Sequence, residues 1–150
     1  MADVAFDDVF PAPLERVWRL LEDHRRDDLI PRIHPLLRRQ TTLQSGEPES
    51  IVERVIDARG HLLTSRWKLT FRPPELYRWD IVSGDGPWEP GSFLESRYSE
   101  TSGGTRIVSH GRLRISVLPF PLPQGWFVRR VLSDIDKEDR AHLASADRRP

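Results

Sequence analysis

Hydrophobic and polar residues change their spacing twice along this 150-residue chain. Alternation over residues 4–10 predicts a first strand, which ends at Pro11. Pro13 then suits the first turn of a helix, where its missing N–H costs nothing. Residues 14–21 carry hydrophobic side chains at the spacing of one helical face: Leu14, Val17, Trp18 and Leu21. The prolines of LIPRIHPLL, residues 29–37, forbid one long helix, so we expect a short second helix or turn there.

From about residue 36 the hydrophobic period becomes two, which is typical of strands. Glycine- and proline-containing turn signals separate the alternating segments, and their regular short spacing predicts consecutive antiparallel hairpins. The predicted strands cover residues 36–44, 50–58, 61–71, 76–82, 92–100 and 105–117.

The last hairpin can be given a register if Gly103 and Gly104 form a two-residue turn. One face then sorts as ionic, with Glu95 opposite Arg112 and Arg97 opposite His110. The other face is apolar or small, and it pairs Tyr98 with Ser109, Ser96 with Gly111, and Leu94 with Leu113. A slip of one residue would scramble this sorting.

After Pro119, Pro121 and Pro123, a long helix is predicted over about residues 123–146, with Val128, Val131, Leu132, Ile135 and Leu143 on one stripe. An antiparallel sheet must cover its apolar face, and this is the only long helix available. The expected fold is therefore α+β: a curved antiparallel sheet of six to seven strands wrapped around the C-terminal helix. The two short helices after strand one would close one end of the groove, in a single domain spanning 1–150.

Composition narrows the functional classes. The chain has no cysteine, and 23 basic residues balance 23 acidic ones, so no electrostatic footprint for nucleic acid is present. No apolar run reaches the length of a membrane span, and no signal peptide is visible in MADVAF. These features predict a cytoplasmic protein without stable membrane insertion.

Four segments resemble a known superfamily: FPAPLERVWRLLED, DLIPRIHPLLRR, PPELYRWDIVSG and GSFLESRYSETSGGTRIVSHGRL, followed by the long helix. Together they resemble the START-like, or SRPBCC, proteins, which have the helix-grip fold of the birch-pollen allergens. The chain is most similar to the bacterial polyketide cyclase/dehydrase-like and coenzyme Q-binding-like branches. The resemblance implies a hydrophobic tunnel between sheet and C-terminal helix. It does not select a function, because this superfamily hosts carriers, cyclases, hydrolases and ribosome-binding proteins.

The inward strand faces mix large aromatic side chains with serine and glycine, which favours a cavity with a few orienting polar groups. The alternative is a filled core in which Trp and Tyr only satisfy their own N–H and O–H groups. One helix cannot fill so large a curved sheet, so we predict a ligand-binding cavity lined by Ser65, Trp67, Leu69, Tyr77, Trp79, Trp88, Tyr98, Ser109, Leu113, Val128 and Leu132.

Catalytic motifs are missing from the sequence. His24, His34, His61, His110 and His142 show no metal-ligand spacing, and there is no G-x-S-x-G segment, so no metal, no cofactor and no assigned catalytic residue are expected. The strand over 50–58 is apolar on both faces. Arg54 therefore either points outward into a salt bridge, which the rarity of buried charge favours, or points inward and binds a ligand carboxylate or enolate.

Three functions stay open. The preferred one is binding or transport of a small hydrophobic molecule, such as a lipid, quinone or polyketide-like aromatic. The runner-up is a polyketide aromatase/cyclase-like enzyme, which a deep pocket with a buried, hydrogen-bonded Arg or Tyr would favour. The third is a ribosome- or partner-binding protein using a basic stripe on the outer face of the last hairpin, Arg97, Arg106, His110, Arg112 and Arg114; such a stripe is more often a solvated strand face.

Overall fold

A computed structural model describes residues 2–116 and 124–147. Each segment with a period of two forms a strand, but the last strand ends at Leu113, before the predicted end of 105–117. Within the described residues the strands are β1 (Ala2–Phe10), β2 (Leu37–Gln44), β3 (Glu49–Ala58), β4 (His61–Arg72), β5 (Leu76–Gly84), β6 (Phe93–Thr101) and β7 (Gly104–Leu113). The helices are α1 (Leu14–Asp23), α2 (Ile30–Ile33) and α3 (Gln124–Asp147). Pro119, Pro121 and Pro123, which precede the predicted last helix, lie outside the described residues.

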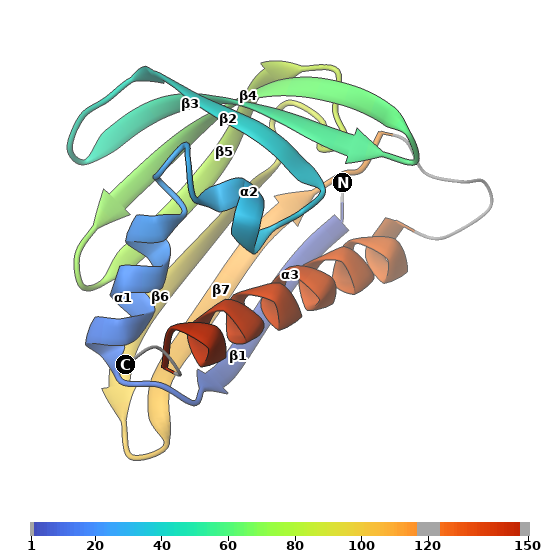
Figure 1. The fold of residues 1–150 in the computed structure, drawn as a ribbon. Coiled ribbons are helices and arrows are strands. Elements are labelled where there is room, and N and C mark those ends of the chain that lie inside the picture. The colour runs from blue at the N-terminus through green and yellow to red at the C-terminus, as the bar shows by residue number, and fades with distance from the viewer. Residues whose placement is uncertain (1, 117–123, 148–150) are drawn as a thin grey trace.

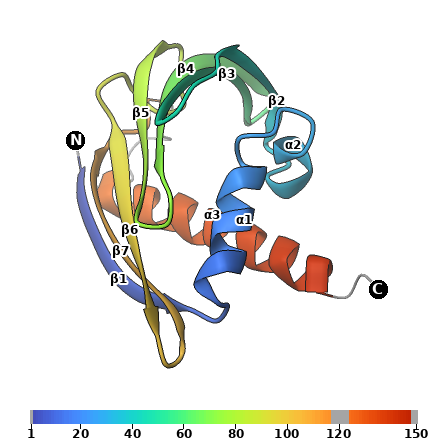
Figure 2. The ribbon, with the colours of Figure 1, turned by 90° about the vertical axis from the view of Figure 1, so that its left-hand side faces the viewer.

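The seven strands form one antiparallel sheet in the order β1-β7-β6-β5-β4-β3-β2. Figure 1 shows α3 crossing the concave side of this sheet, and Figure 2 shows how strongly the sheet curves around it. The expected α+β helix-grip architecture is therefore confirmed.

The two short helices lie at one end of the concave space, near the C-terminal half of α3 (Figures 1 and 2). α1 buries Val17, Trp18 and Leu21 of the predicted face and also Leu20, whereas the predicted Leu14 is half-buried. α2 has Pro31 in its first turn and stops at Ile33, two residues before Pro35. Pro31 is tolerated in the first turn because its N–H would have no partner there, whereas Pro35 cannot continue the helix.

The register predicted for the last hairpin is wrong by two residues. The turn residues are Ser102 and Gly103, and Thr101 pairs with Gly104. Consequently, Glu95 lies opposite His110 and Ser96 opposite Ser109.

The reason for this difference lies in the neighbouring strand. Gly104 has a φ of +134°, and a Cβ at this position would collide with the backbone oxygen of Phe10 in β1. A glycine is therefore needed at position 104 because β7 comes close to β1 there, and not because the residue belongs to the turn. A two-residue slip leaves every side chain on the same face, so the ionic and apolar sorting is unchanged.

Neighbouring carboxylates pair with the basic stripe on the convex face of the sheet. Each of its five members lies within ion-pair distance of a carboxylate: Arg97 and His110 with Glu95, Arg106 with Asp7, Arg112 with Asp3, and Arg114 with Glu89. This pairing is typical of a solvated strand face and weakens the case for an acidic partner.

Candidate functional site

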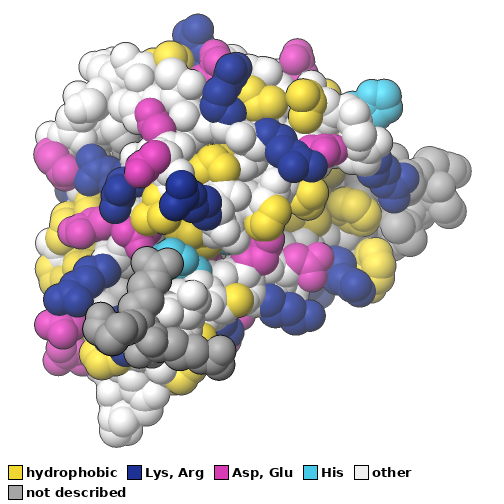
Figure 3. Space-filling view, in the orientation of Figure 1, with side chains coloured by type: hydrophobic (Ala, Val, Ile, Leu, Met, Phe, Trp, Pro, Cys, Tyr) yellow, Lys and Arg dark blue, Asp and Glu magenta, His cyan; other side chains and the backbone are white. Residues whose placement is uncertain are grey.

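A cavity of about 1030 Å³ lies between the concave sheet face and α3. Its wall includes residues of all seven strands and all three helices that the structure describes. Exposed wall residues come from the β3–β4 turn on one side, such as Arg59 and His61, and from α3 on the other, such as Arg129 and Asp136. Figure 3 shows hydrophobic side chains in the band between the upper part of the sheet and α3, flanked by charged groups of both signs. The volume is at the upper end of what small-molecule sites use.

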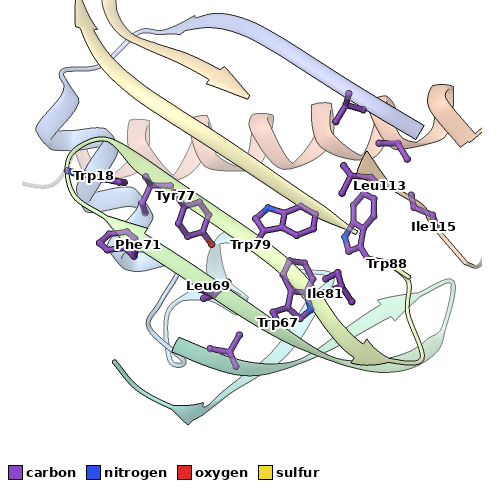
Figure 4. Close-up of a cluster of buried hydrophobic side chains, with 14 residues drawn as sticks. Trp18, Trp67, Leu69, Phe71, Tyr77, Trp79, Ile81, Trp88, Leu113 and Ile115 are labelled. Carbon is purple, nitrogen blue, oxygen red and sulfur yellow. The ribbon is translucent and has the colours of Figure 1, made fainter. Parts of the chain in front are cut away.

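Three tryptophans dominate one end of the cavity, which we call the aromatic end: Trp67, Trp79 and Trp88 (Figure 4). The ring centroids of Trp67 and Trp79 lie 4.8 Å apart, and those of Trp79 and Trp88 lie 5.7 Å apart. Trp67 donates its Nε1–H to Ser65 Oγ at 2.8 Å, which holds the indole in place from behind. Trp88 pairs with Ile115 by an isolated bridge, close to the start of α3. These rings provide a rigid apolar surface.

The predicted cavity residues divide into two groups. Seven line the cavity: Trp67, Tyr77, Trp79, Trp88, Tyr98, Ser109 and Leu132. The other four, Ser65, Leu69, Leu113 and Val128, are fully or almost fully buried and support the wall without lining it. That any of the eleven contacts a ligand stays a prediction.

Arg54 points into the protein, so the favoured prediction of an outward salt bridge is wrong. Its residue is 5% exposed and belongs to the cavity wall. Nε donates to Gln40 Oε1 at 2.8 Å, and Nη2 donates to the His24 backbone oxygen at 3.5 Å. The guanidinium also lies 4.4 Å from the centre of the Trp67 ring. Stacking and hydrogen bonds together offset the cost of burying this charge.

Two tyrosines line the cavity, and the hydroxyl of one of them, Tyr77, interacts with the Arg54 guanidinium. Burial raises the pKa of Tyr77, although the neighbouring Arg54 guanidinium opposes that shift. Burial likewise raises the pKa of Tyr98, which also lines the cavity. Both hydroxyls are therefore neutral at physiological pH and are able to donate a hydrogen bond. Burial lowers the pKa of Arg54, while Tyr77 and Asp27 act in the opposite direction.

Four charged or titratable side chains form what we call the polar end: His24, His34, Arg54 and Asp139. His24 directly follows α1, His34 directly follows α2, and Asp139 lies in the second half of α3. Asp139 Oδ1 is 2.8 Å from His24 Nε2 and 3.0 Å from His34 Nε2. Burial by itself would raise the pKa of Asp139, but the two imidazoles outweigh it and hold that pKa well below its usual range.

Glu138 extends the polar end by one partner. His34 Nδ1 lies 3.2 Å from Glu138 Oε1. Burial alone would lower the pKa of His34, but the carboxylates of Asp139 and Glu138 outweigh it and raise that pKa above its ordinary value. The pattern of histidine spacing gave no sign of this cluster, because its members come from three elements and His24 is 115 residues from Asp139.

Among the described residues, no helix is long and apolar enough to cross a membrane.

Comparison with protein families gives one match over almost the whole chain. The model of the family described as polyketide cyclase / dehydrase and lipid transport matches residues 1–145. The chain belongs to this family. No curated protein matches it in sequence.

Solved structures agree on the fold. The protein Ara h 8.0201 superimposes with a TM-score of 0.75 at 15% identity, over 96% of this chain and 98% of that one. The two-domain aromatase/cyclase StfQ of the steffimycin pathway gives 0.73 at 15% identity, over 96% of this chain and 50% of that one. The ZhuI aromatase/cyclase of Streptomyces sp. R1128 gives 0.63 at 19% identity, over 99% and 94%. Family and fold together support a ligand-binding or polyketide cyclase role, without selecting between them.

Proposed function

We propose that this protein binds a small hydrophobic, polyketide-like molecule in the cavity, with an oxygen-bearing group of the ligand held at Arg54. The single observation that carries the proposal is the buried guanidinium in the wall of a large, mainly apolar cavity. An apolar ligand body would stack on Trp67 and Trp79, as planar aromatic molecules do on tryptophan. A carboxylate, enolate or phenolate at one end would then receive charge-assisted hydrogen bonds.

The test uses two fluorescent probes of nearly the same shape. Anilinonaphthalene sulfonate carries an anion, and N-phenylnaphthylamine lacks it. We expect the parent protein to bind both probes and to increase their emission. Arg54→Met, which keeps much of the apolar side-chain volume, should weaken binding of the sulfonate about tenfold or more and leave the uncharged probe almost unchanged.

Two results would count against the proposal. If the parent binds neither probe, the cavity does not accept apolar molecules in solution. If Arg54→Met loses both probes equally, the arginine maintains the cavity but does not select the ligand. Native mass spectrometry of the protein as purified, followed by solvent extraction, would then identify any natural adduct.

A second function, polyketide aromatase/cyclase activity, is favoured by a specific observation. A buried, hydrogen-bonded arginine also favours an enzyme, and Arg54 has the buried Tyr77 beside it in the cavity wall. The guanidinium would stabilise an enolate oxygen, and the neutral Tyr77 hydroxyl would donate a hydrogen bond to the same oxygen. No covalent intermediate with the protein is needed.

This second function is tested by product analysis. The protein is added to a minimal polyketide synthase that releases linear poly-β-ketone chains, and the products are resolved by liquid chromatography. A cyclase changes the ratio of ring patterns, and Tyr77→Phe and Arg54→Met reverse that change. If the protein binds the fluorescent probes but the product ratio does not change, cyclase activity is excluded and the binding function remains.

A further inference from the structure

Three ligand-type atoms converge at the polar end. His24 Nε2, His34 Nε2 and Asp139 Oδ1 form a triangle with sides of 2.8, 3.0 and 3.4 Å. An ion with bonds of about 2.0–2.1 Å can reach all three corners of a triangle of this size. The three residues come from separate elements, so the folded chain is what brings them together.

Without an ion, the cluster would be a network of hydrogen bonds and ion pairs. His34 has a carboxylate oxygen on each ring nitrogen, Glu138 at Nδ1 and Asp139 at Nε2, so both nitrogens would have to donate and the ring would be a buried cation. His24 would donate to the same Asp139 oxygen. Two N–H groups would then converge on one oxygen atom, with their Nε2 atoms only 3.4 Å apart.

We propose that His24, His34 and Asp139 bind a divalent transition-metal ion, which reverses the expectation drawn from histidine spacing. With an ion present, both Nε2 atoms contribute lone pairs and neither needs a proton. Neutral imidazoles leave the charges of Asp139 and Glu138, and a divalent cation neutralises both. The inference does not depend on the proposed function, because metal binding can be measured without a cavity ligand.

Glu138 supplies the second layer of such a site. Metal-binding histidines usually donate the other ring N–H to a carboxylate or carbonyl, which fixes the tautomer and increases basicity. The Glu138 carboxylate lies 3.2 Å from His34 Nδ1, where it is able to accept a hydrogen bond from Nδ1–H. Glu138 is only partly buried, so its replacement should leave the fold intact.

The donor set defines the class of ion. Two imidazoles and one carboxylate suit Zn²⁺, Fe²⁺ or Co²⁺ better than Mg²⁺ or Ca²⁺, which prefer oxygen ligands alone. Three protein ligands leave at least one position open. Since all three residues line the cavity, a molecule in the cavity could reach that position.

The experiment starts from protein made metal-free with a chelator and titrated with Co²⁺ and Zn²⁺. We expect one Co²⁺ per chain, visible absorption stronger than that of the aqueous ion, and loss of this absorption as Zn²⁺ displaces Co²⁺. Zn²⁺ affinity is measured by calorimetry. Asp139→Asn and His34→Gln should abolish stoichiometric binding, and Glu138→Gln should weaken it about 10- to 100-fold.

His142→Gln is the matched control. His142 Nε2 lies 3.1 Å from Asp23 Oδ2, so this pair also joins α3 to α1. Among the residues that the structure describes, it does not belong to a group of three side chains able to hold a metal ion. This variant should bind metal as the parent does.

The proposal is overturned if metal-free parent protein takes up no stoichiometric Co²⁺ or Zn²⁺, which would make the cluster an ion-pair network only. It is equally overturned if His142→Gln loses binding as much as Glu138→Gln does. Should Asp139→Asn fail to fold, the parent's Co²⁺ spectrum and the Glu138→Gln affinity still decide the question.

Discussion

The two ends of the cavity are built by different forces. At the aromatic end, Trp67, Trp79 and Trp88 pack by the hydrophobic effect, which is non-directional and tolerates small changes of angle. At the polar end, each charged group depends on a specific partner from another element, as Asp139 does on His24 and His34. The ends meet where Arg54 stacks on Trp67.

This difference shows which contacts give the cavity its shape and which give it chemistry. Apolar packing leaves a space that any flat hydrophobic molecule of suitable size can enter. Buried polar groups select among such molecules, because an unpaired charge in this environment is costly. Selectivity should therefore be concentrated at the polar end, while stability should depend most on the apolar packing.

The largest loss of stability should come from Leu113→Ala. Leu113 is 0% exposed and belongs to the same buried cluster as the three tryptophans of the aromatic end, but it does not line the cavity. Truncation should lower the free energy of unfolding by about 2–5 kcal/mol, measured by urea denaturation. Probe binding by the fraction that stays folded should be unchanged. A loss below about 1 kcal/mol would show that the side chains around Leu113 rearrange to fill the space that the truncation leaves.

Arg54→Met should come next, with a loss of about 1–3 kcal/mol, because the buried Gln40 Oε1 loses its donor and the His24 carbonyl keeps only the Gln40 amide. The matched control is Arg78→Met. Arg78 also stacks on an aromatic ring, with its guanidinium 4.2 Å from the centre of the Phe93 ring, but it is half-buried and paired with Asp80. The control should lose well under about 1 kcal/mol. Equal losses in the two variants would remove the distinction between the cavity arginine and an ordinary stacked one.

Ser65→Ala should have a smaller effect, about 1 kcal/mol, since Trp67 Nε1–H loses its acceptor in a buried setting. The indole N–H resonance of Trp67 should shift in a proton–nitrogen NMR spectrum. If neither the stability nor the resonance changes, the serine does not hold the indole, and the aromatic end relies on ring packing alone.

Arg106→Ala should have no measurable effect on the unfolding midpoint. Arg106 and Asp7 form an exposed ion pair between β7 and β1, where solvent screens the interaction. This variant should also bind both fluorescent probes like the parent. A clear loss of binding would move the functional surface from the concave to the convex face of the sheet.

The sequence predicted most of the fold because alternation and helical spacing are strong over long segments. The segment over 14–21 and the strands after residue 36 have the structure that their periods indicate. The hairpin register was missed because a two-residue shift preserves the faces, and because the decisive contact of Gly104 is with Phe10, 94 residues earlier in the chain.

The candidate site was predictable only at its aromatic end. Trp67 and Trp79 have inward positions that follow directly from alternation in their strands. Arg54 could not be placed, because β3 has about as many apolar residues on one face as on the other. His24, His34 and Asp139 meet only through tertiary packing of the helices, which leaves no local pattern in the chain.

α3 is fastened to the rest of the molecule near both of its ends. Gln124 exchanges hydrogen bonds with the backbone of Ile115 at 3.0 and 2.9 Å, and Asp139 and His142 attach the other half to residues following or ending α1. The segment between these anchors includes Phe127, Val131 and Leu132 of the cavity wall. Substitutions of these middle residues can therefore change the size and shape of the ligand that the cavity accepts, while the contacts at both ends still hold the helix in place.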